Sequence, residues 1–537
     1  MSVDENLKVE TSEGVRGLRR GVEQNPDDAN AHLLLGSALA EAGQPAEALG
    51  HLQRSVELDL SLVRGHIRLG NLLREFSRTG EAVEAYGRAL ELRPGDPFIL
   101  SNLGNAWLDL SEAGRAIDCY RQSLEIHPDA PTTYSNLIFA MQYDSGISRE
   151  EIAAAHREWG GRFGRAPGQA ESTVRQAFDG RQPLRVGFLS ADFRYHPVGR
   201  MASALWQNLD RDRVTPIVYD NSTDDSSAKR RYRELVAEWH DIAALPDDAV
   251  AERIRTDRLD VLVDLSGHTS GNRLGVLAQK PAPVQATLFA YPNTTGLPSV
   301  DWRITDTLAD PPGTESLYVE QLLRLPSVAW VYGAPEDSPE PDGLPCLAGE
   351  PFTFGCLNNP AKISAAAVET WSGILRACPG SRLTLLVRDD SAHEGLLLAK
   401  FERHGIGAGQ LVFAVKGPER DYLERHNCID LMLDPFPYNG GVTTADCLWM
   451  GTPILALEGD SYVSRQGVSL LMNVGLPELI AADSEALVAR AVGWFEAPER
   501  LAKLVDGLRG RLQRSPLMDH AGYARNFAEA LEGIVTA

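Results

Sequence analysis

Residues 433–453, which read LDPFPYNGGVTTADCLWMGTP, decide the fold. The apolar run 429–433 predicts a buried parallel strand, and a turn rich in proline and glycine follows it. Thr443 and Thr444 then open a helical pattern, whose first turn offers free N–H groups and a dipole that favours an anion. We interpret the stretch as a nucleotide-phosphate cradle, with Asp446 on the first helical turn to accept hydrogen bonds from ribose hydroxyls. An ordinary strand–turn–helix with a helix cap is the alternative.

The composition is that of a globular protein with an excess of acidic residues. The 537 residues are enough for roughly three domains. The formal net charge of −22 disfavours nucleic acid and anionic membrane as partners, although a nucleotide-sized anion needs only a local cation. The six cysteines show no C-x-x-C pairing, which predicts reduced thiols and no zinc site. Residues 1–10 do not resemble a signal peptide and no apolar run reaches membrane-spanning length, so we expect a cytoplasmic protein.

The first third of the chain is a repeat array. Small residues recur at one spacing of 34 residues: Gly36, Gly70 and Gly104, and likewise Ala48, Ala82 and Ala116. Each unit reads as a helix, a short turn and a second helix, and the match in phase predicts a tetratricopeptide α-solenoid over residues 1–146. Such solenoids present a concave groove that commonly binds extended peptide, so we expect protein or peptide partners there. A purely structural cap on the rest of the chain is the alternative.

The remaining chain alternates strands with helices. A helical linker is expected over residues 147–182, followed by two α/β domains at 183–345 and 346–537. The expected strands of the first domain are 184–190, 214–219 and 261–265, with a further strand between two Pro/Gly loops within residues 280–298. Those of the second domain are 352–357, 382–387, 411–413, 429–433 and 454–457. This alternation predicts right-handed βαβ units and parallel sheets, in which ligands bind beyond the carboxyl ends of the strands.

Several polar side chains follow those strand ends. His196 lies in the loop after the first strand, where Pro197 restricts its backbone, and His268 follows the third strand. Lys362 lies between a strand end and a helix start, where a cation would meet a diphosphate; a solvated lysine is the alternative. The loop 293–296 combines Asn, Thr and Gly, whose backbone N–H groups could face a ligand. No paired-aspartate metal signature follows any strand, so Lys362 and helix termini are the expected means of neutralising a diphosphate leaving group.

With these residues assembled, the chain resembles the protein O-GlcNAc transferases and the SPINDLY-type protein O-fucosyltransferases. The matching parts are the repeats, Asp192-Phe193 with His196-Pro197, residues 281–285, residues 291–296, Asp306, Lys362 and residues 439–453. The resemblance implies tetratricopeptide repeats fused to a GT-B pair of Rossmann-like domains, an overall α plus α/β class. It also implies inverting sugar transfer from a nucleotide sugar to Ser or Thr hydroxyls of proteins, without a metal or another cofactor.

The resemblance also implies roles for individual residues. His196 is similar to the family's active-site histidine, either as general base or as the group that orients the acceptor hydroxyl. Lys362 matches the diphosphate-binding lysine, Thr443 the phosphate-binding threonine and Asp446 the ribose-binding aspartate. The other residues of the implied nucleotide-sugar site are Asn359, Gly417, Tyr422, Arg425, Gly441, Val442 and Thr444.

Two departures from the family pattern bear on the donor. Gly441-Val442-Thr443 replaces the family's His-Thr-Thr, and Glu419 stands where the animal enzymes carry lysine. Tyr422 fills space in the expected base pocket, and the backbone at residues 415–417 can hydrogen-bond a uracil edge, so UDP-GlcNAc is the favoured donor. A GDP-fucose-dependent protein O-fucosyltransferase and a catalytically weak peptide-binding scaffold are the alternatives.

Overall fold

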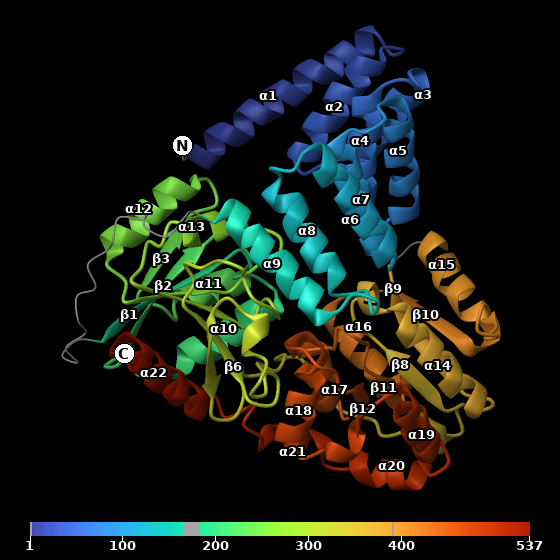
Figure 1. Cartoon of the computed structure of the whole chain (residues 1–537). Coiled ribbons are helices and arrows are strands. Elements are labelled where there is room, and N and C mark those ends of the chain that lie inside the picture. Colours follow the sequence, from blue (N-terminus) through green and yellow to red (C-terminus); the bar gives the residue numbers. More distant parts are fainter. Residues whose placement is uncertain (1–2, 165–182, 389–390, 416, 537) are drawn as a thin grey trace. The chain divides into compact units, whose positions relative to one another are not determined.

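The computed structural model describes residues 3–164, 183–388, 391–415 and 417–536 (Figure 1). It divides into two compact units, and we describe each by itself. The repeat unit comprises Met1–Ala140 and Val387–Lys400, and the α/β unit comprises Met141–Leu386 and Phe401–Ala537. Residues 165–182, which the sequence assigns to a linker, lie outside the described residues. Among the residues that are described, no helix is both long enough and apolar enough to cross a membrane.

The repeat unit is the predicted helical solenoid. Its helices are α1 Val3–Gln24, α2 Ala29–Glu41, α3 Pro45–Leu58, α4 Val63–Glu75, α5 Thr79–Leu92, α6 Pro97–Asp109, α7 Ala113–Ile126 and α8 Pro131–Met141. The carboxylates of Asp28 and Asp96 cap α2 and α6 by accepting from backbone N–H groups of the first turn. The recurrent glycine has a packing cause, because a Cβ atom on Gly104 would lie 2.6 Å from the buried ring of Tyr120.

The repeat unit also contains α15, Ser391–Glu402, for most of its length. The carboxyl end of α6 and the loop that follows it contact this helix and Arg388, which comes before it in the chain. Arg388 donates to Asp109 at 2.6 Å, and the ammonium of Lys400 lies 3.0 Å from Glu112. The sequence did not predict this helix, whose amphipathic pattern is weak.

The first sheet of the α/β unit has seven parallel strands in the order β3-β2-β1-β4-β5-β6-β7. The strands are β1 Leu184–Ser190, β2 Val214–Asp220, β3 Glu238–Asp241, β4 Val261–Asp264, β5 Val284–Leu288, β6 Trp302–Asp306 and β7 Gln321–Leu325. Helix α9, Arg149–Phe163, precedes the first strand, and the connections carry α10 Pro197–Asn208, α11 Ser227–Arg233, α12 Asp247–Asp257 and α13 Leu274–Leu277. The predicted strands are present, whereas β3, β6 and β7 were not predicted. The residues of the short edge strand β3 are polar and mostly half-buried.

The second sheet has six strands in the order β10-β9-β8-β11-β12-β13. They are β8 Thr353–Cys356, β9 Arg382–Val387, β10 Leu411–Val415, β11 Leu431–Leu433, β12 Ile454–Leu457 and β13 Ile480–Ala481. The helices are α14 Ala365–Ala377, α16 Glu419–Glu424, α17 Val442–Trp449, α18 Gln466–Val474, α19 Ser484–Phe495, α20 Pro498–Val505 and α21 Leu508–Gln513. Strand β11 begins two residues later than predicted because Arg425–Cys428 form a 3₁₀ turn before it.

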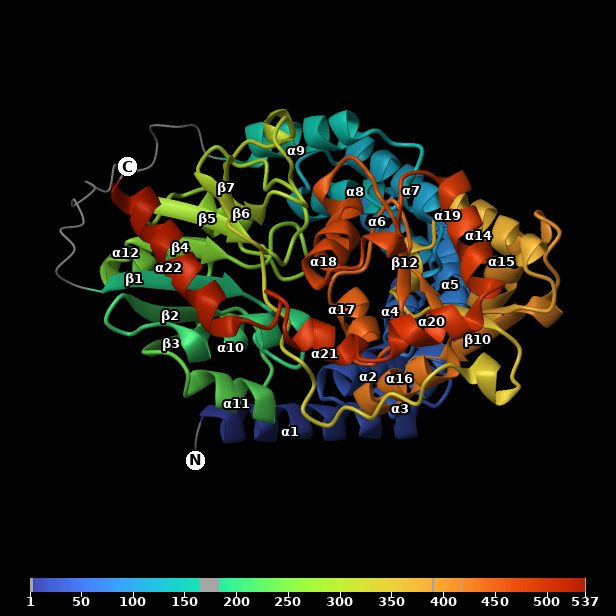
Figure 2. The same cartoon turned by 90° about the horizontal axis from the view of Figure 1, so that it is seen from below.

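The C-terminal helix α22, His520–Thr536, lies against the first sheet rather than the second (Figure 2). The ring of Phe527 stacks on that of Phe188 in β1 with 6.3 Å between centroids, and Glu532 pairs with Arg213 at 2.7 Å. A single division of the two α/β domains at residue 346 therefore does not describe this helix.

Both sheets have a topological switch point, where the strand order reverses. In the first sheet it lies between β1 and β4, and in the second between β8 and β11. Crevices beyond the carboxyl ends of such strands are the usual ligand sites of open α/β sheets. His196 follows β1, Lys362 follows β8, and the stretch 434–441 follows β11.

Candidate active site

The turn between β11 and α17 is organised by Asp434, which is fully buried. One carboxylate oxygen accepts from the N–H of Gly440 at 2.7 Å and from the Thr444 hydroxyl at 3.5 Å. Helix α17 begins after Gly441, and no side chain in this described stretch caps its start by a hydrogen bond. The first turn of α17 is thus the kind of helix start that binds anions.

Lys362 ends a 3₁₀ turn, Pro360–Lys362, that follows β8. Its ammonium donates to the Asn439 carbonyl at 2.7 Å and lies 4.2 Å from the ring centroid of Tyr438. Burial lowers the pKa of Lys362, and the negative charge of Asp434 acts in the opposite direction. A bound diphosphate would add negative charge beside this ammonium and stabilise its protonated form.

Asp446 lies one turn inside α17, not on its first turn as the sequence predicted, because the helix begins at Val442. Its carboxylate accepts from the hydroxyl of Tyr332 at 2.7 Å and from that of Tyr422 at 3.5 Å. Burial raises the pKa of Asp446 to about 6, and the charge of Arg200 opposes that rise. Tyr422 also hydrogen-bonds Thr443, so three of the predicted donor-site residues meet at this end of α17.

His196 is the N-cap of α10, at the carboxyl end of the first sheet. Its Nδ1 accepts from the backbone N–H of Val198 at 3.3 Å, and it lies 3.8 Å from Asp192, which is too long for a hydrogen bond. In this geometry a neutral imidazole carries its proton on Nε2, so it offers a donor to an oxygen rather than a base. Of the two roles that the resemblance allows, the arrangement favours orienting an oxygen over removing a proton.

The remaining predicted residues lie at the rim of this region. The exposed Asn359 accepts from the N–H of Ala361 at 3.2 Å, and it thereby caps the turn that carries Lys362. Arg425 begins the 3₁₀ turn before β11, and its buried Nε has no hydrogen-bond partner among the described residues. Gly417 lies between β10 and α16, beside Asp421, whereas Lys416 is outside the described residues.

Three residues of this region were not found from the sequence. Asp434 holds the turn, and Tyr332 and Arg200 contact Asp446 from outside the second sheet. Arg200 follows His196 by one helical turn, a spacing that places both on one face of α10. Arg200 could have been identified from that spacing in the sequence. Tyr332 could not, because it lies in a segment without helical or strand periodicity.

Two other loops have structural roles. His268 is buried, its Nε2 lies 2.9 Å from the Thr295 carbonyl, and burial lowers its pKa to about 4. The sequence suggested that backbone N–H groups of the loop 293–296 could face a ligand, but those of residues 294–296 donate to side chains of the protein. The N–H of Thr295 donates to the buried carboxylate of Glu320 at 2.6 Å, and that of Gly296 donates to the Thr294 hydroxyl at 3.1 Å.

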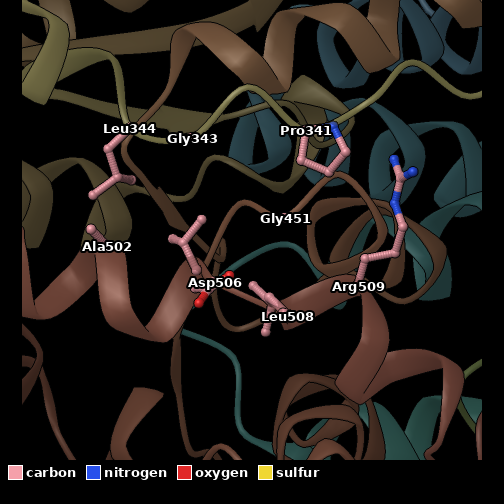
Figure 3. Close-up of a pocket in the computed structure, with 10 residues that line it drawn as sticks. Pro341, Gly343, Leu344, Gly451, Ala502, Asp506, Leu508 and Arg509 are labelled. Atoms are coloured by element: carbon pink, nitrogen blue, oxygen red, sulfur yellow. The ribbon is translucent and has the colours of Figure 1, made fainter.

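A separate pocket of about 320 Å³ lies near the carboxyl end of α17 (Figure 3). Pro341, Gly451, Asp506 and Arg509 are among the residues that line it, and none of the predicted donor-site residues does. The guanidinium of Arg509 donates to the carbonyl oxygens of Trp449 and Pro339, each at 2.6 Å. Its hydrogen bonds therefore stabilise the local fold.

Comparison with known proteins covers both units. Residues 165–334 and 345–527 match glycosyl transferase family 41, and residues 11–59 and 67–131 match the tetratricopeptide repeat. The probable UDP-N-acetylglucosamine–peptide N-acetylglucosaminyltransferase SPINDLY of Solanum lycopersicum is 34% identical over 397 residues, which are 72% of this chain and 42% of that protein. Its Arabidopsis thaliana counterpart is 34% identical over 395 residues, 72% of this chain and 43% of that protein.

A solved structure extends the similarity to nearly the whole chain. A mutant of the O-GlcNAc transferase of Thermobaculum terrenum has a TM-score of 0.87 and 29% sequence identity, over 95% of this chain and 97% of that one. The chain spans less than half the length of the curated plant relatives. The family match itself covers most of the chain, including both sheets and the stretch from Lys362 to Asp446. The chain therefore belongs to glycosyl transferase family 41.

Proposed function

We propose that this chain transfers N-acetylglucosamine from UDP-N-acetylglucosamine to Ser or Thr hydroxyls of proteins, with inversion, in the cytoplasm. The observation that carries the proposal is the meeting of Lys362, the start of α17 and Asp446 beyond the switch point of the second sheet. The printed names of the plant relatives give the same donor and a peptide acceptor. The six cysteines, all free thiols, suit a reducing compartment.

The proposed chemistry divides between the two sheets. Lys362 and the N–H groups of the first turn of α17 stabilise the negative charge that develops on the diphosphate as the bond to the sugar breaks. Asp446 and Tyr422 hold the nucleoside, and the backbone at Gly417 lies within the predicted base site. His196, from the first sheet, orients the acceptor or a sugar oxygen through its Nε2–H.

The proposed reaction uses no metal ion. The Lys362 ammonium and the helix start supply the positive charge that a metal would otherwise bring to a diphosphate. Glu238, His240 and Asp257 are the group of potential metal ligands that the described residues bring together, on β3 and α12. Arg253 donates to Asp257 at 3.0 Å and contacts His240 at 3.2 Å, so a guanidinium already pairs with that group.

Two measurements test the proposal. Binding of UDP and GDP identifies the donor nucleotide, and sugar transfer in the presence of a chelator tests whether a metal ion is needed. We expect UDP to bind at least about tenfold more tightly than GDP, because unmatched polar edges of a base are rejected steeply. We also expect radiolabelled GlcNAc transfer to a protein mixture to persist with excess EDTA. Tighter binding of GDP would favour fucose as the sugar, and loss of transfer with EDTA would overturn the metal-free mechanism. Absence of both donor hydrolysis and transfer would favour a catalytically weak peptide-binding scaffold.

The repeat groove is proposed to select the protein acceptors. Deletion of residues 1–61 removes α1 to α3 and retains Asp109 and Glu112, which contact Arg388 and Lys400. We expect modification of whole-protein substrates to fall about tenfold or more, because a second contact raises the effective concentration of the acceptor. Affinity for UDP, measured by calorimetry, should stay within a few-fold. Unchanged modification of whole proteins would assign the first repeats a purely structural role.

A further inference from the structure

Arg200 lies where the two sheets of the α/β unit meet, one helical turn after His196 on α10. Its backbone N–H donates to the His196 carbonyl at 3.2 Å. Its guanidinium reaches elements of the second sheet: it lies 3.1 Å from Glu419 on α16 and 3.7 Å from Asp446 on α17. The side chain of Arg200 is 20% exposed and that of Asp446 is 7% exposed, whereas Glu419 is half exposed. The Arg200–Asp446 pair is therefore much less screened by solvent than the Arg200–Glu419 pair.

The carboxyl group of Asp446 is surrounded by groups of different charge. The titratable and charged groups that face it from α10, the segment after β7, α16 and α17 are Arg200, Tyr332, Glu419, Tyr422 and Cys447. Arg200 is the cation of this set. Tyr332 and Tyr422 donate neutral hydrogen bonds, and Glu419 adds a negative charge that disfavours ionisation of Asp446.

We propose that Arg200 is a positioning residue for the sugar-nucleotide donor, which keeps Asp446 ionised and aimed so that its carboxylate accepts hydrogen bonds from the ribose hydroxyls. This inference rests on the proposed function, because it takes Asp446 as the nucleoside-binding carboxylate. It assigns to a residue of the first sheet a part in donor binding at the second.

The physical argument follows from burial and distance. Burial favours the neutral form of Asp446 and raises its pKa to about 6 even with Arg200 in place. An opposite charge within a few ångströms lowers the pKa of a carboxyl group by about 1 to 3. Loss of Arg200 would therefore move the pKa of Asp446 further upward, and a larger fraction of the carboxyl would be protonated at neutral pH. A protonated carboxyl group has lost part of its capacity to accept ribose hydroxyl bonds.

The effect has a definite direction with pH. In the absence of Arg200, affinity for the donor is reduced at neutral pH and below, and it recovers as rising pH ionises Asp446. Burial also lowers the pKa of Lys362, so affinity for a diphosphate can fall at alkaline pH in any variant. The ratio of the dissociation constants of variant and wild type removes that shared dependence.

The test measures UDP binding by calorimetry for the wild type and Arg200→Gln. We expect the variant to bind UDP about tenfold more weakly near pH 7, the effect of a pKa displaced by about 2, and the ratio to fall toward one near pH 9. Arg200→Lys keeps the charge and should restore most of the affinity. Glu419→Gln removes the competing carboxylate and should leave affinity unchanged or improve it. Arg420→Gln removes an exposed arginine that pairs with Glu424 on the same helix and serves as the matched control.

Two results would overturn the inference. A ratio near one at neutral pH would show that Asp446 does not need Arg200, and a raised ratio that does not change with pH would indicate a direct contact with the diphosphate or a structural role. If wild-type protein binds no nucleoside diphosphate, the proposed function fails. A double-mutant cycle on thermal unfolding with Arg200→Gln and Asp446→Asn then still decides the coupling of the pair. Additive losses in the double variant would contradict the inference without reference to any donor.

Discussion

Replacement of Lys362 by alanine should lower sugar transfer by at least about a hundredfold at saturating donor, because loss of one charge-stabilising donor costs about 3 kcal/mol in the transition state. The ammonium of Lys362 lies beside the start of α17, held by the Asn439 carbonyl at 2.7 Å and by the ring of Tyr438. The variant should still fold. Burial already raises the pKa of Asp434, so that carboxyl group can take up a proton when its cation is lost.

The measurement is the steady-state rate with each variant, supported by a melting curve. Lys503→Ala, which removes an exposed lysine of α20, provides the control for loss of one positive charge. Wild-type turnover of Lys362→Ala would exclude Lys362 from the mechanism. A parallel collapse of the melting temperature would instead assign it a structural role.

Replacement of Gly160 by alanine should destabilise the α/β unit by about 3 kcal/mol, at the upper end of the usual cost of overpacking. A Cβ atom at Gly160 in α9 would lie 1.7 Å from the carbonyl oxygen of Gly296. Neither side can yield easily, because Gly296 has a φ of +75° and its own Cβ position lies 2.1 Å from the His156 carbonyl oxygen. The helix and the loop 293–296 are thus in backbone contact.

Denaturant unfolding of Gly160→Ala and Gly161→Ala makes the comparison. A Cβ atom at Gly161 meets nothing within 4 Å, so that variant gains helix propensity and should be stabilised by about 0.5–1 kcal/mol. Equal stabilities of the two variants would contradict the close packing of α9 on the loop. Affinity for UDP should persist in both variants where they are folded, because α17 lies elsewhere in the unit.

The sequence predicted those features that local patterns encode. The repeats were recognised because Gly36, Gly70 and Gly104 stay in phase, and each close helix pair needs a small residue at that point. Most of the parallel strands were recognised because they are short apolar runs that alternate with helices, whereas β3, β6 and β7 were not. His196 and Lys362 were placed at strand ends by the same alternation, and the switch points explain why strand ends matter.

The features that the sequence did not predict depend on contacts between distant segments. Asp446 receives Tyr332 and Arg200 from positions more than a hundred residues away in the chain. The sequence of the loop 293–296 alone suggested backbone N–H groups available to a ligand. In the structure the N–H of Thr295 donates to Glu320, a residue that the loop sequence does not reveal as a partner. In the repeat unit, Asp109 pairs with Arg388, which precedes α15, and Glu112 pairs with Lys400 of α15. These contacts cannot be predicted from a periodic pattern in the residues of α15.

The return of α22 to the first sheet makes the second sheet an insertion within the first domain. The chain enters the second sheet after β7 and leaves it before α22. The two crossings are hydrogen-bonded to each other, because the backbone N–H of Tyr332 donates to the Leu517 carbonyl at 2.8 Å. Because the two connecting segments lie side by side, the domains can rotate about the line through both segments more readily than they can separate. We therefore expect the two sheets to move relative to one another mainly by rotation about this line. Deletion of α22 is expected to destabilise the first sheet, although the strands of that sheet lie far from α22 in the sequence.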